Sequence, residues 1–257
     1  MTAASLLLSK NGKLPAEVLD TAAIRLTELI LRSQKRKAFK YDAEKHHQVA
    51  RDAAARSAVL LKNEKSLLPG NIKQKAAVIG AFAKIPRYQG TGSSKINPTK
   101  LDDACEELHR VGLVFDYAPG YHLNSDMPDA VLIKEACKAA EGKDIVYIYA
   151  GLPDSYEAES FDRVSLSMPA SHNKLIEAIT AVNKHVVVVL LGGAPIEVPW
   201  ANKVQAILLM YLGGEACGGA SADLLLGKVN PGGKLAESWP IKDRKSTRLN
   251  SSHRIRY

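Results

Sequence analysis

The sequence predicts an α/β protein: a mostly parallel sheet of five to six strands with helices on both faces (an α/β sandwich), preceded by a separate helical segment. Apolar runs typical of buried strands alternate with amphipathic segments of about ten to fifteen residues, which indicates βαβ units. The run HVVVVLLGG at residues 185–193 is largely β-branched, as is typical of a strand buried on both faces. With 257 residues, 46% of them hydrophobic, the chain can bury a substantial core.

Two helices are expected before the sheet begins. Apolar side chains recur at helical spacing over residues 15–37, and the Lys/Arg cluster at 32–37 suits a last turn. A second helix is expected over residues 42–63, with Asp42 as its N-cap.

Strands and helices then alternate along the chain. Strands are expected at residues 75–80, 113–120, 144–151, 185–193 and 206–214, and we also consider an edge strand at 234–239. Helices are expected at residues 100–111, 129–141, 169–183 and 215–227. Strands joined through helices of this length run parallel, because the chain must cross back before it starts the next strand.

The net charge of +8 lies at the two ends of the chain. Residues 1–40 carry a net charge of +5 and residues 244–257 another +5, so residues 41–243 carry −2. A domain-wide basic face is therefore not expected, and we expect no nucleic-acid partner. No apolar run approaches the length that crosses a bilayer, so we expect no membrane-spanning segment.

The cysteines and histidines do not have the spacing of a metal site. Cys105, Cys137 and Cys217 are odd in number and far apart, which gives neither a disulfide framework nor a zinc site. Reduced, buried thiols in a cytoplasmic protein are expected instead. His46 and His47 are helix neighbours about 100° apart, so they cannot share one ion and are interpreted as ordinary helix residues. We expect no metal and no cofactor.

Two carboxylates follow the expected strand at 144–151. Glu157 and Glu159 belong to the loop GLPDSYEAESFDR, residues 151–163, which leads from that strand to the next helix. Open α/β sheets bind ligands in crevices at the carboxyl ends of their strands. Judged from these two residues alone, a solvated acidic loop is the favoured interpretation.

Six motifs, taken together, resemble glycoside hydrolase family 3. They are LLKNE, PRYQGTGSS, GLPDSYEAESFDR, PIEVPW, YLGGEA and NPGGKL, and the resemblance runs from about residue 15 to residue 242. It implies the C-terminal α/β sandwich domain of a β-glucosidase-type enzyme. In that family the nucleophile is an Asp of a separate barrel domain, and no residue here matches its motif.

The resemblance divides the chain into three parts. Residues 1–40 correspond to a remnant of the barrel's end and its linker helix, and residues 41–243 to the sandwich domain. Residues 244–257 are basic, polar and without periodicity, so we expect a non-native disordered tail. The competing interpretation is a genuine basic tail for nucleic acid or a membrane surface.

The resemblance also implies a mechanism. Family members are retaining exo-glycosidases, so the chain is expected to be a fragment of an enzyme that hydrolyses terminal β-D-glucosyl residues, inactive by itself. Glu159 matches the acid/base residue, because the family's Glu stands three positions before the Asp-Arg pair; Glu157 is the fallback. A general acid needs a raised pKa, and repulsion between the two glutamates is expected to supply it.

The resemblance further implies contacts with a small carbohydrate substrate. Ser93 matches a serine that touches the terminal glucosyl unit, and Tyr156 could form an aromatic wall for the departing group. A flexible turn and a packed loop tyrosine are the alternatives for these two residues. Asp162 and Arg163 are expected to pair within the domain, and Ser160 stands where glycine is common.

Two other function classes stay open. The domain could be a non-catalytic sugar-binding or scaffold module. A nucleotide-binding, flavodoxin-like domain also fits the strand pattern, but Gly90-Thr91-Gly92 lacks the third glycine and the following helix of a dinucleotide fingerprint. Binding assays with glucose and with nucleotides would separate these classes.

Overall fold

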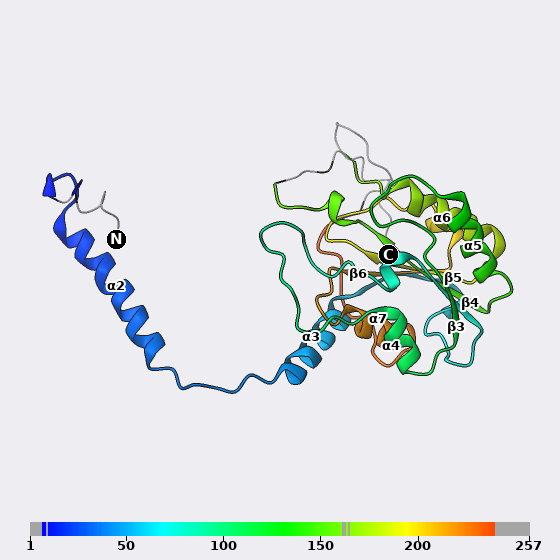
Figure 1. The fold of residues 1–257 in the computed structure, drawn as a ribbon, viewed down its shortest axis with the longest axis horizontal. Coiled ribbons are helices and arrows are strands. Elements are labelled where there is room, and N and C mark those ends of the chain that lie inside the picture. Colours follow the sequence, from blue (N-terminus) through cyan, green and yellow to red (C-terminus); the bar gives the residue numbers. More distant parts are fainter. Residues whose placement is uncertain (1–6, 9, 161–162, 164, 240–257) are drawn as a thin grey trace. The chain divides into compact units, whose positions relative to one another are not determined.

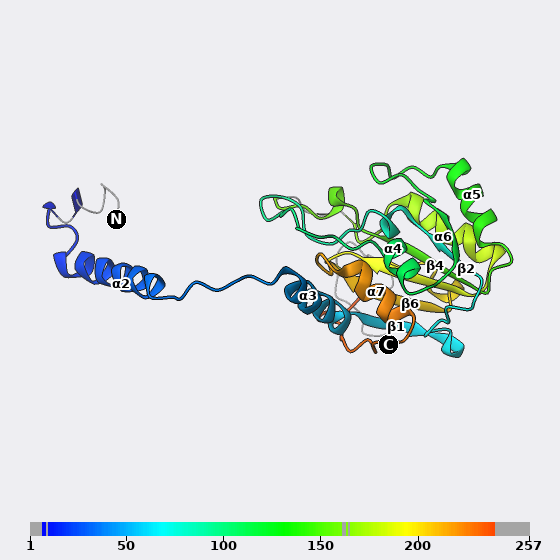
Figure 2. The same cartoon turned by 60° about the horizontal axis from the view of Figure 1, so that its bottom comes forward.

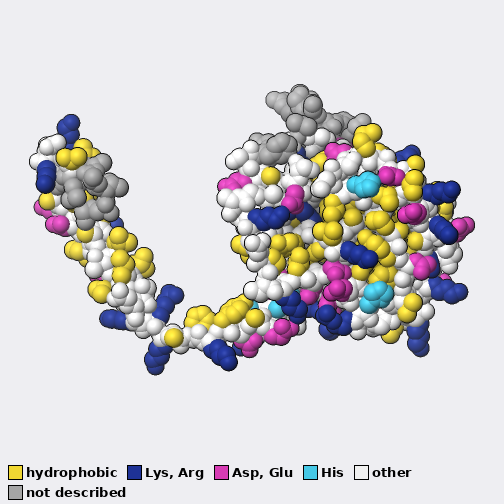
Figure 3. All heavy atoms as spheres, viewed as in Figure 1, with side chains coloured by type: hydrophobic (Ala, Val, Ile, Leu, Met, Phe, Trp, Pro, Cys, Tyr) yellow, Lys and Arg dark blue, Asp and Glu magenta, His cyan; other side chains and the backbone are white. Residues whose placement is uncertain are grey.

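The computed structural model describes residues 7–8, 10–160, 163 and 165–239. These residues fall into two units: the first ends at Asp42 and the second begins at Ala43. The first unit contains α2 (Ala16–Gln34), close to the expected helix. No side chain of α2 is buried, and most of its large apolar residues are exposed (Figure 3). A helix with an apolar stripe is stabilised mainly by packing that stripe on something else, and the described part of this unit offers no such surface.

The second unit is built on a six-stranded sheet in the order β1-β6-β5-β4-β2-β3. The strands are β1 (Val59–Asn63), β2 (Ala76–Ile79), β3 (Phe115–Ala118), β4 (Ile145–Gly151), β5 (Val186–Leu191) and β6 (Ala206–Tyr211). All neighbouring pairs are parallel except β1 with β6. The prediction of a mostly parallel sheet is therefore confirmed.

Helices cover both faces of this sheet, as predicted. One face carries α3 (Ala43–Ser57), α4 (Ala104–Arg110) and α7 (Cys217–Leu225), and the other carries α5 (Ala130–Ala140) and α6 (Ala170–Val182) (Figures 1 and 2). Two of these helices begin at aspartate caps: Asp103 accepts from the backbone N–H of Glu106, and Asp129 from that of Val131.

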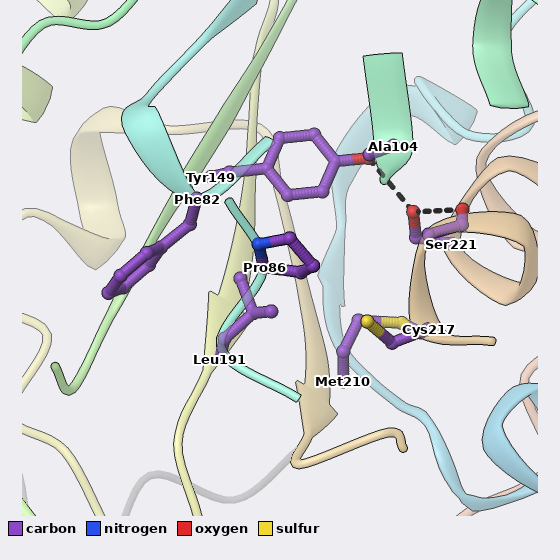
Figure 4. A pocket seen from close by; sticks show the side chains of 9 residues that line it. Phe82, Pro86, Ala104, Tyr149, Leu191, Met210, Cys217 and Ser221 are labelled. Atoms are coloured by element: carbon purple, nitrogen blue, oxygen red, sulfur yellow. Dashed lines mark hydrogen bonds between the residues drawn. The ribbon is translucent and has the colours of Figure 1, made fainter. Parts of the chain in front are cut away.

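The strands β4 and β5 form the centre of the core. Every residue of both strands is buried, which accounts for their continuous apolar sequences. A small cavity of about 10 Å³ lies between the β4 side chain Tyr149 and the α7 residues Cys217 and Ser221 (Figure 4). Tyr149 Oη and Ser221 Oγ lie 3.0 Å apart and share a hydrogen bond. A space of this size holds at most one water, so it is not a substrate site.

Two predictions about the sheet edges are wrong. The second helix ends at Ser57 rather than at residue 63, and residues 59–63 form β1. Pairing with β6 decides this: Val59 lies opposite Leu209, and the 2% exposed Leu61 packs into the core. Tertiary pairing of this kind overrides the local helical preference of a Leu/Lys segment. Residues 234–239 form no strand.

His47 of α3 has a structural role that its sequence context did not reveal. Its ring is buried, with Nε2 2.9 Å from the Asp102 carboxylate and Nδ1 3.1 Å from that of Glu215. Because the two partners lie on opposite sides of the ring, the arrangement joins α3 to the segments before α4 and α7. Among the described residues, no group of three or more His, Cys, Asp or Glu is arranged to hold a metal ion.

The described helices include none that is long and apolar enough to cross a membrane. All three cysteines are free thiols; Cys105 and Cys217 are buried.

The direction of the chain changes between β2 and β4. These strands are hydrogen-bonded neighbours, yet the chain leaves β2 toward α4 on one face and β4 toward α6 on the other. The segments that follow their carboxyl ends therefore diverge. Such a switch point is where open α/β sheets place their ligand sites.

Candidate active site at the switch point

Two loops meet at this switch point. The serine loop, residues 85–96, follows β2, and the acid loop, residues 152–163, follows β4. They touch through an isolated parallel bridge between Thr91 and Ala158, in which the Glu159 N–H donates to the Thr91 carbonyl over 2.9 Å. Parallel β2–β4 pairing brings the two loops together, because it places both carboxyl ends at the same edge.

The structure brings Glu159 and Ser93 into contact. The Oε2 atom of Glu159 accepts a hydrogen bond from the Ser93 backbone N–H over 2.8 Å and a second from the Ser93 hydroxyl. Gly92 permits this approach: its φ is +116°, and a Cβ there would lie 2.5 Å from the Glu159 Cβ. The carboxylate itself is exposed to solvent.

The two Ser93 hydrogen bonds lower the pKa of Glu159. The side-chain bond has the larger effect and the backbone bond the smaller, and both favour the charged form of the carboxyl group. The expectation that repulsion from Glu157 raises this pKa is therefore wrong for this structure. The physical reason is that the neighbouring donors act directly on the carboxylate, whereas Glu157 points elsewhere.

Glu157 faces into the base of the acid loop. Its two carboxylate oxygens lie 2.9 and 3.0 Å from the Gly193 backbone nitrogen, which donates to them, and the side chain is 14% exposed. Arg87 Nη2 lies 3.8 Å from Oε2. The two glutamates therefore have different surroundings, and of the two only Glu159 is exposed to solvent.

Arg87 is a site residue that the sequence analysis missed. Its buried guanidinium, with a side chain 4% exposed, donates to backbone carbonyls in both loops and pairs with Asp154. The signal in the sequence is its place directly after Pro86 in the PRYQGTGSS motif, within the loop that follows β2. Burial was not visible there, because most loop arginines are solvated.

The remaining predicted site residues serve mainly as loop contacts. The Tyr156 hydroxyl donates to Asp126 over 2.7 Å; burial, and then this hydrogen bond, raise the pKa of Tyr156 to about 12. Arg163 donates to the Pro195 carbonyl over 2.8 Å, while Asp162, its expected partner, lies outside the described residues. Ser160 has a φ of +64°, the left-handed conformation that the usual glycine would adopt more easily.

A cleft of about 270 Å³ opens beside the two loops. Its walls are largely apolar, and polar side chains come from Arg87, Gln89, Lys95, Asn124 and Asp154. The other lining residues are Phe82, Ile85, Pro86, Tyr88, Leu101, Leu123 and Pro153. Lys95 of the serine loop and Asp154 of the acid loop form an exposed ion pair over 3.0 Å at this cleft.

Comparison with known proteins points to one family. The model of the glycosyl hydrolase family 3 C-terminal domain matches residues 58–256. The chain is 50% identical over 238 residues to thermostable beta-glucosidase B of Acetivibrio thermocellus, covering 91% of this chain and 32% of that protein. It is 40% identical over 245 residues to an exo-alpha-(1->6)-L-arabinopyranosidase of Bifidobacterium breve, covering 90% of this chain and 32% of that protein. The family match continues into the expected tail, residues 244–257, which lies outside the described residues.

Solved structures agree with the sequence matches. A beta-glucosidase of Bifidobacterium adolescentis, 39% identical, superposes with a TM-score of 0.87 over 92% of this chain and 35% of that one. Beta-glucosidase 3B from Thermotoga neapolitana, solved with alpha-D-glucose and 26% identical, superposes with a TM-score of 0.78 over 92% and 37%. The chain thus spans about a third of the length of the curated relatives it matches.

Proposed function

Because this chain belongs to glycoside hydrolase family 3, as its C-terminal domain, we propose that it supplies the acid/base loop of a retaining exo-β-glycosidase. The observation that carries the proposal is the exposed Glu159 carboxylate, held by Ser93 at the switch point of the sheet. Glu159 is the acid/base in this proposal, Ser93 is the residue that would contact the terminal β-D-glucosyl unit, and Tyr156 the one that would contact its leaving group. The nucleophile comes from a barrel domain outside this chain.

The proposed reaction needs two carboxyl groups about 5–5.5 Å apart. The barrel's carboxylate attacks the anomeric carbon while Glu159 gives its proton to the departing oxygen; Glu159 then takes a proton from the water that releases the sugar. The first step needs the protonated acid, and in this chain the pKa of Glu159 is lowered. Burial disfavours a carboxylate, so a second domain and a substrate that cover the loop would raise that pKa.

Two further observations support a partner domain. Most large apolar residues of α2 are exposed, including Ile24 at 59% and Leu29 at 63%. The relatives are about three times as long as the part that this chain matches.

We also propose a reducing, cytoplasmic location, which the three free cysteines support.

A chimera tests this function. The matching third of thermostable beta-glucosidase B is replaced by this chain, and hydrolysis of cellobiose, an aryl β-D-glucoside and an aryl α-L-arabinopyranoside is measured. We expect turnover by the chimera and none by the chain alone. Glu159→Ala should lower cellobiose cleavage by about 10²–10⁴-fold. An activated aryl glucoside should lose less, because its leaving group hardly needs protonation, and azide should restore turnover as glycosyl azide.

Three outcomes would change the assignment. Azide rescue of Glu157→Ala, with Glu159→Ala near wild type, would make Glu157 the acid/base. An inactive chimera together with glucose binding by the chain, followed by nuclear magnetic resonance, would favour the non-catalytic sugar-binding module. Robust turnover by the isolated chain would mean that no external nucleophile is needed.

A further inference from the structure

We propose that Arg87 is a positioning residue: with Glu157, it clamps the acid loop to the serine loop and thereby holds Glu159 against Ser93. The inference rests on the proposed function for its catalytic consequence. Its structural part, that Arg87 keeps the two loops together, can be tested on this chain alone.

The contacts of Arg87 reach both loops. Its Nε donates to the Leu152 carbonyl over 3.1 Å and its Nη2 to the Glu157 carbonyl over 3.1 Å, both in the acid loop. Its Nη1 donates to the Gln89 carbonyl in the serine loop and lies 3.1 Å from Asp154 Oδ1. One planar guanidinium therefore satisfies carbonyls at the beginning and in the middle of the acid loop.

The guanidinium suits this task for physical reasons. It presents five N–H donors in a rigid fork, whereas a lysine ammonium is a single point with rotating donors. Because the side chain is 4% exposed, water does not compete for the carbonyls, and an unpaired carbonyl left there would cost free energy. The buried charge is offset by Asp154 at 3.1 Å and, more distantly, by Glu157 at 3.8 Å.

Glu157 completes the clamp from the other side. Its carboxylate accepts from the Gly193 N–H in the segment after β5, while its carbonyl accepts from Arg87. The acid loop is thus tied to its neighbours on both sides at residue 157, two positions before the proposed acid/base. Ala158 then bridges to Thr91, and Glu159 follows with its carboxylate at Ser93. A shift at residue 157 must therefore move Glu159.

Amide hydrogen exchange on this chain tests the holding of the loops. Arg87→Met removes every donor, and Arg51→Met is the matched control. Arg51 is a buried arginine, 14% exposed, that pairs with Glu107 and Asp223 near α3, α4 and α7. Both variants should lower the midpoint of thermal unfolding. Only Arg87→Met should speed exchange at the Glu159 and Ser93 amides, measured well below the unfolding midpoint.

Kinetics of the active chimera test the catalytic consequence. A displacement of about 1 Å in a reacting group can cost about 10²-fold in rate, so Arg87→Met should lower kcat for cellobiose by that order. The activated aryl glucoside should lose much less in its first step, and KM should change little, since the loss concerns a group that acts in the transition state. Arg87→Lys should recover only part of the rate, and Arg51→Met should leave the ratio of the two substrates unchanged.

Glu157→Gln separates positioning from proton transfer. The amide oxygen can still accept from Gly193 N–H, and whatever activity this variant loses should not be restored by azide, because no proton transfer has been removed. Glu159→Gln should lose cellobiose cleavage and be rescued by azide.

The failures can be told apart. Equal loop exchange in Arg87→Met and Arg51→Met, or an unchanged substrate ratio in an active Arg87→Met chimera, would overturn the clamp and leave the proposed function standing. An inactive wild-type chimera would contradict the proposed function. The exchange measurement alone would then show whether Arg87 holds the two loops together.

Discussion

The carboxylate of Glu159 accepts a hydrogen bond from the Ser93 backbone N–H over 2.8 Å, although 66 positions separate the two residues. The contact exists because β2 and β4 are parallel neighbours, so the loops after them leave the same edge of the sheet. The same contact lowers the pKa of Glu159, because both donors favour the charged form of its carboxyl group.

Ser93→Ala should raise the pKa of Glu159 toward its ordinary range. The serine hydroxyl is the largest cause of the lowered pKa, and the backbone N–H remains in the variant. A lowered carboxyl pKa adds stability above the unfolded-state pKa, and this is lost as the pH falls through the folded-state pKa. The titration is followed by carbon nuclear magnetic resonance of the side-chain carboxyl. Ser94→Ala, which leaves both described donors in place, is the control; equal pKa values in the two variants would contradict the assignment.

Gly92→Ala should displace Glu159 from Ser93. The new Cβ would lie 2.5 Å from the Glu159 Cβ, and alanine rarely adopts the φ of +116° found there. Gly90→Ala is a matched control two positions away, because its Cβ would meet only Ser94 Oγ, at 3.9 Å. Amide chemical shifts of the acid loop should change in the first variant and stay close to wild type in the second. Similar shifts in both would show that the loops are not in close contact.

His172→Gln should make the domain less sensitive to acid. Burial lowers the pKa of His172 to about 3, and Gly151 N–H donates to its Nδ1 over 3.2 Å. The unfolded chain takes up this proton near a pKa of about 6.5, whereas the folded chain does not. The free energy of unfolding therefore decreases as the pH is lowered. Between about pH 7 and pH 5 this residue should account for a loss of about 2 kcal/mol. Urea unfolding at both pH values measures it; an unchanged difference in the glutamine variant would disprove the role.

Arg51→Met should destabilise the domain far more than Lys100→Met. Arg51 Nε lies 2.7 Å from Asp223, and its Nη1 2.7 Å from Glu107; the two carboxylates are 5% and 2% exposed. Removing one partner of such a buried pair costs about 3–5 kcal/mol. Lys100 pairs with Glu44 in an exposed contact, 41% and 79% exposed, of a kind that contributes about 0–1 kcal/mol. Equal unfolding midpoints in denaturant would show that the buried network does not support the fold.

The central strands could be predicted because a strand buried on both faces has a continuous apolar sequence, which can be recognised without the structure. Val186–Leu191 contains only apolar residues, most of them β-branched, and such a short run favours a strand buried on both faces. At the edge of the sheet this apolar pattern is weaker. Residues 59–63 continue a helix by local preference, and only pairing with β6 makes them a strand.

The sequence by itself determined the residue types of the candidate site and the segments after β2 and β4 that carry them. It also determined the family resemblance, since the motifs are contiguous stretches. The tertiary structure alone decided which glutamate faces solvent, that Ser93 lowers the pKa of Glu159 where repulsion was expected to raise it, and that Arg87 joins the two loops. The physical reason is that pKa values and loop positions depend on contacts between residues far apart in the chain, such as Ser93 with Glu159, and only strand order brings those residues together.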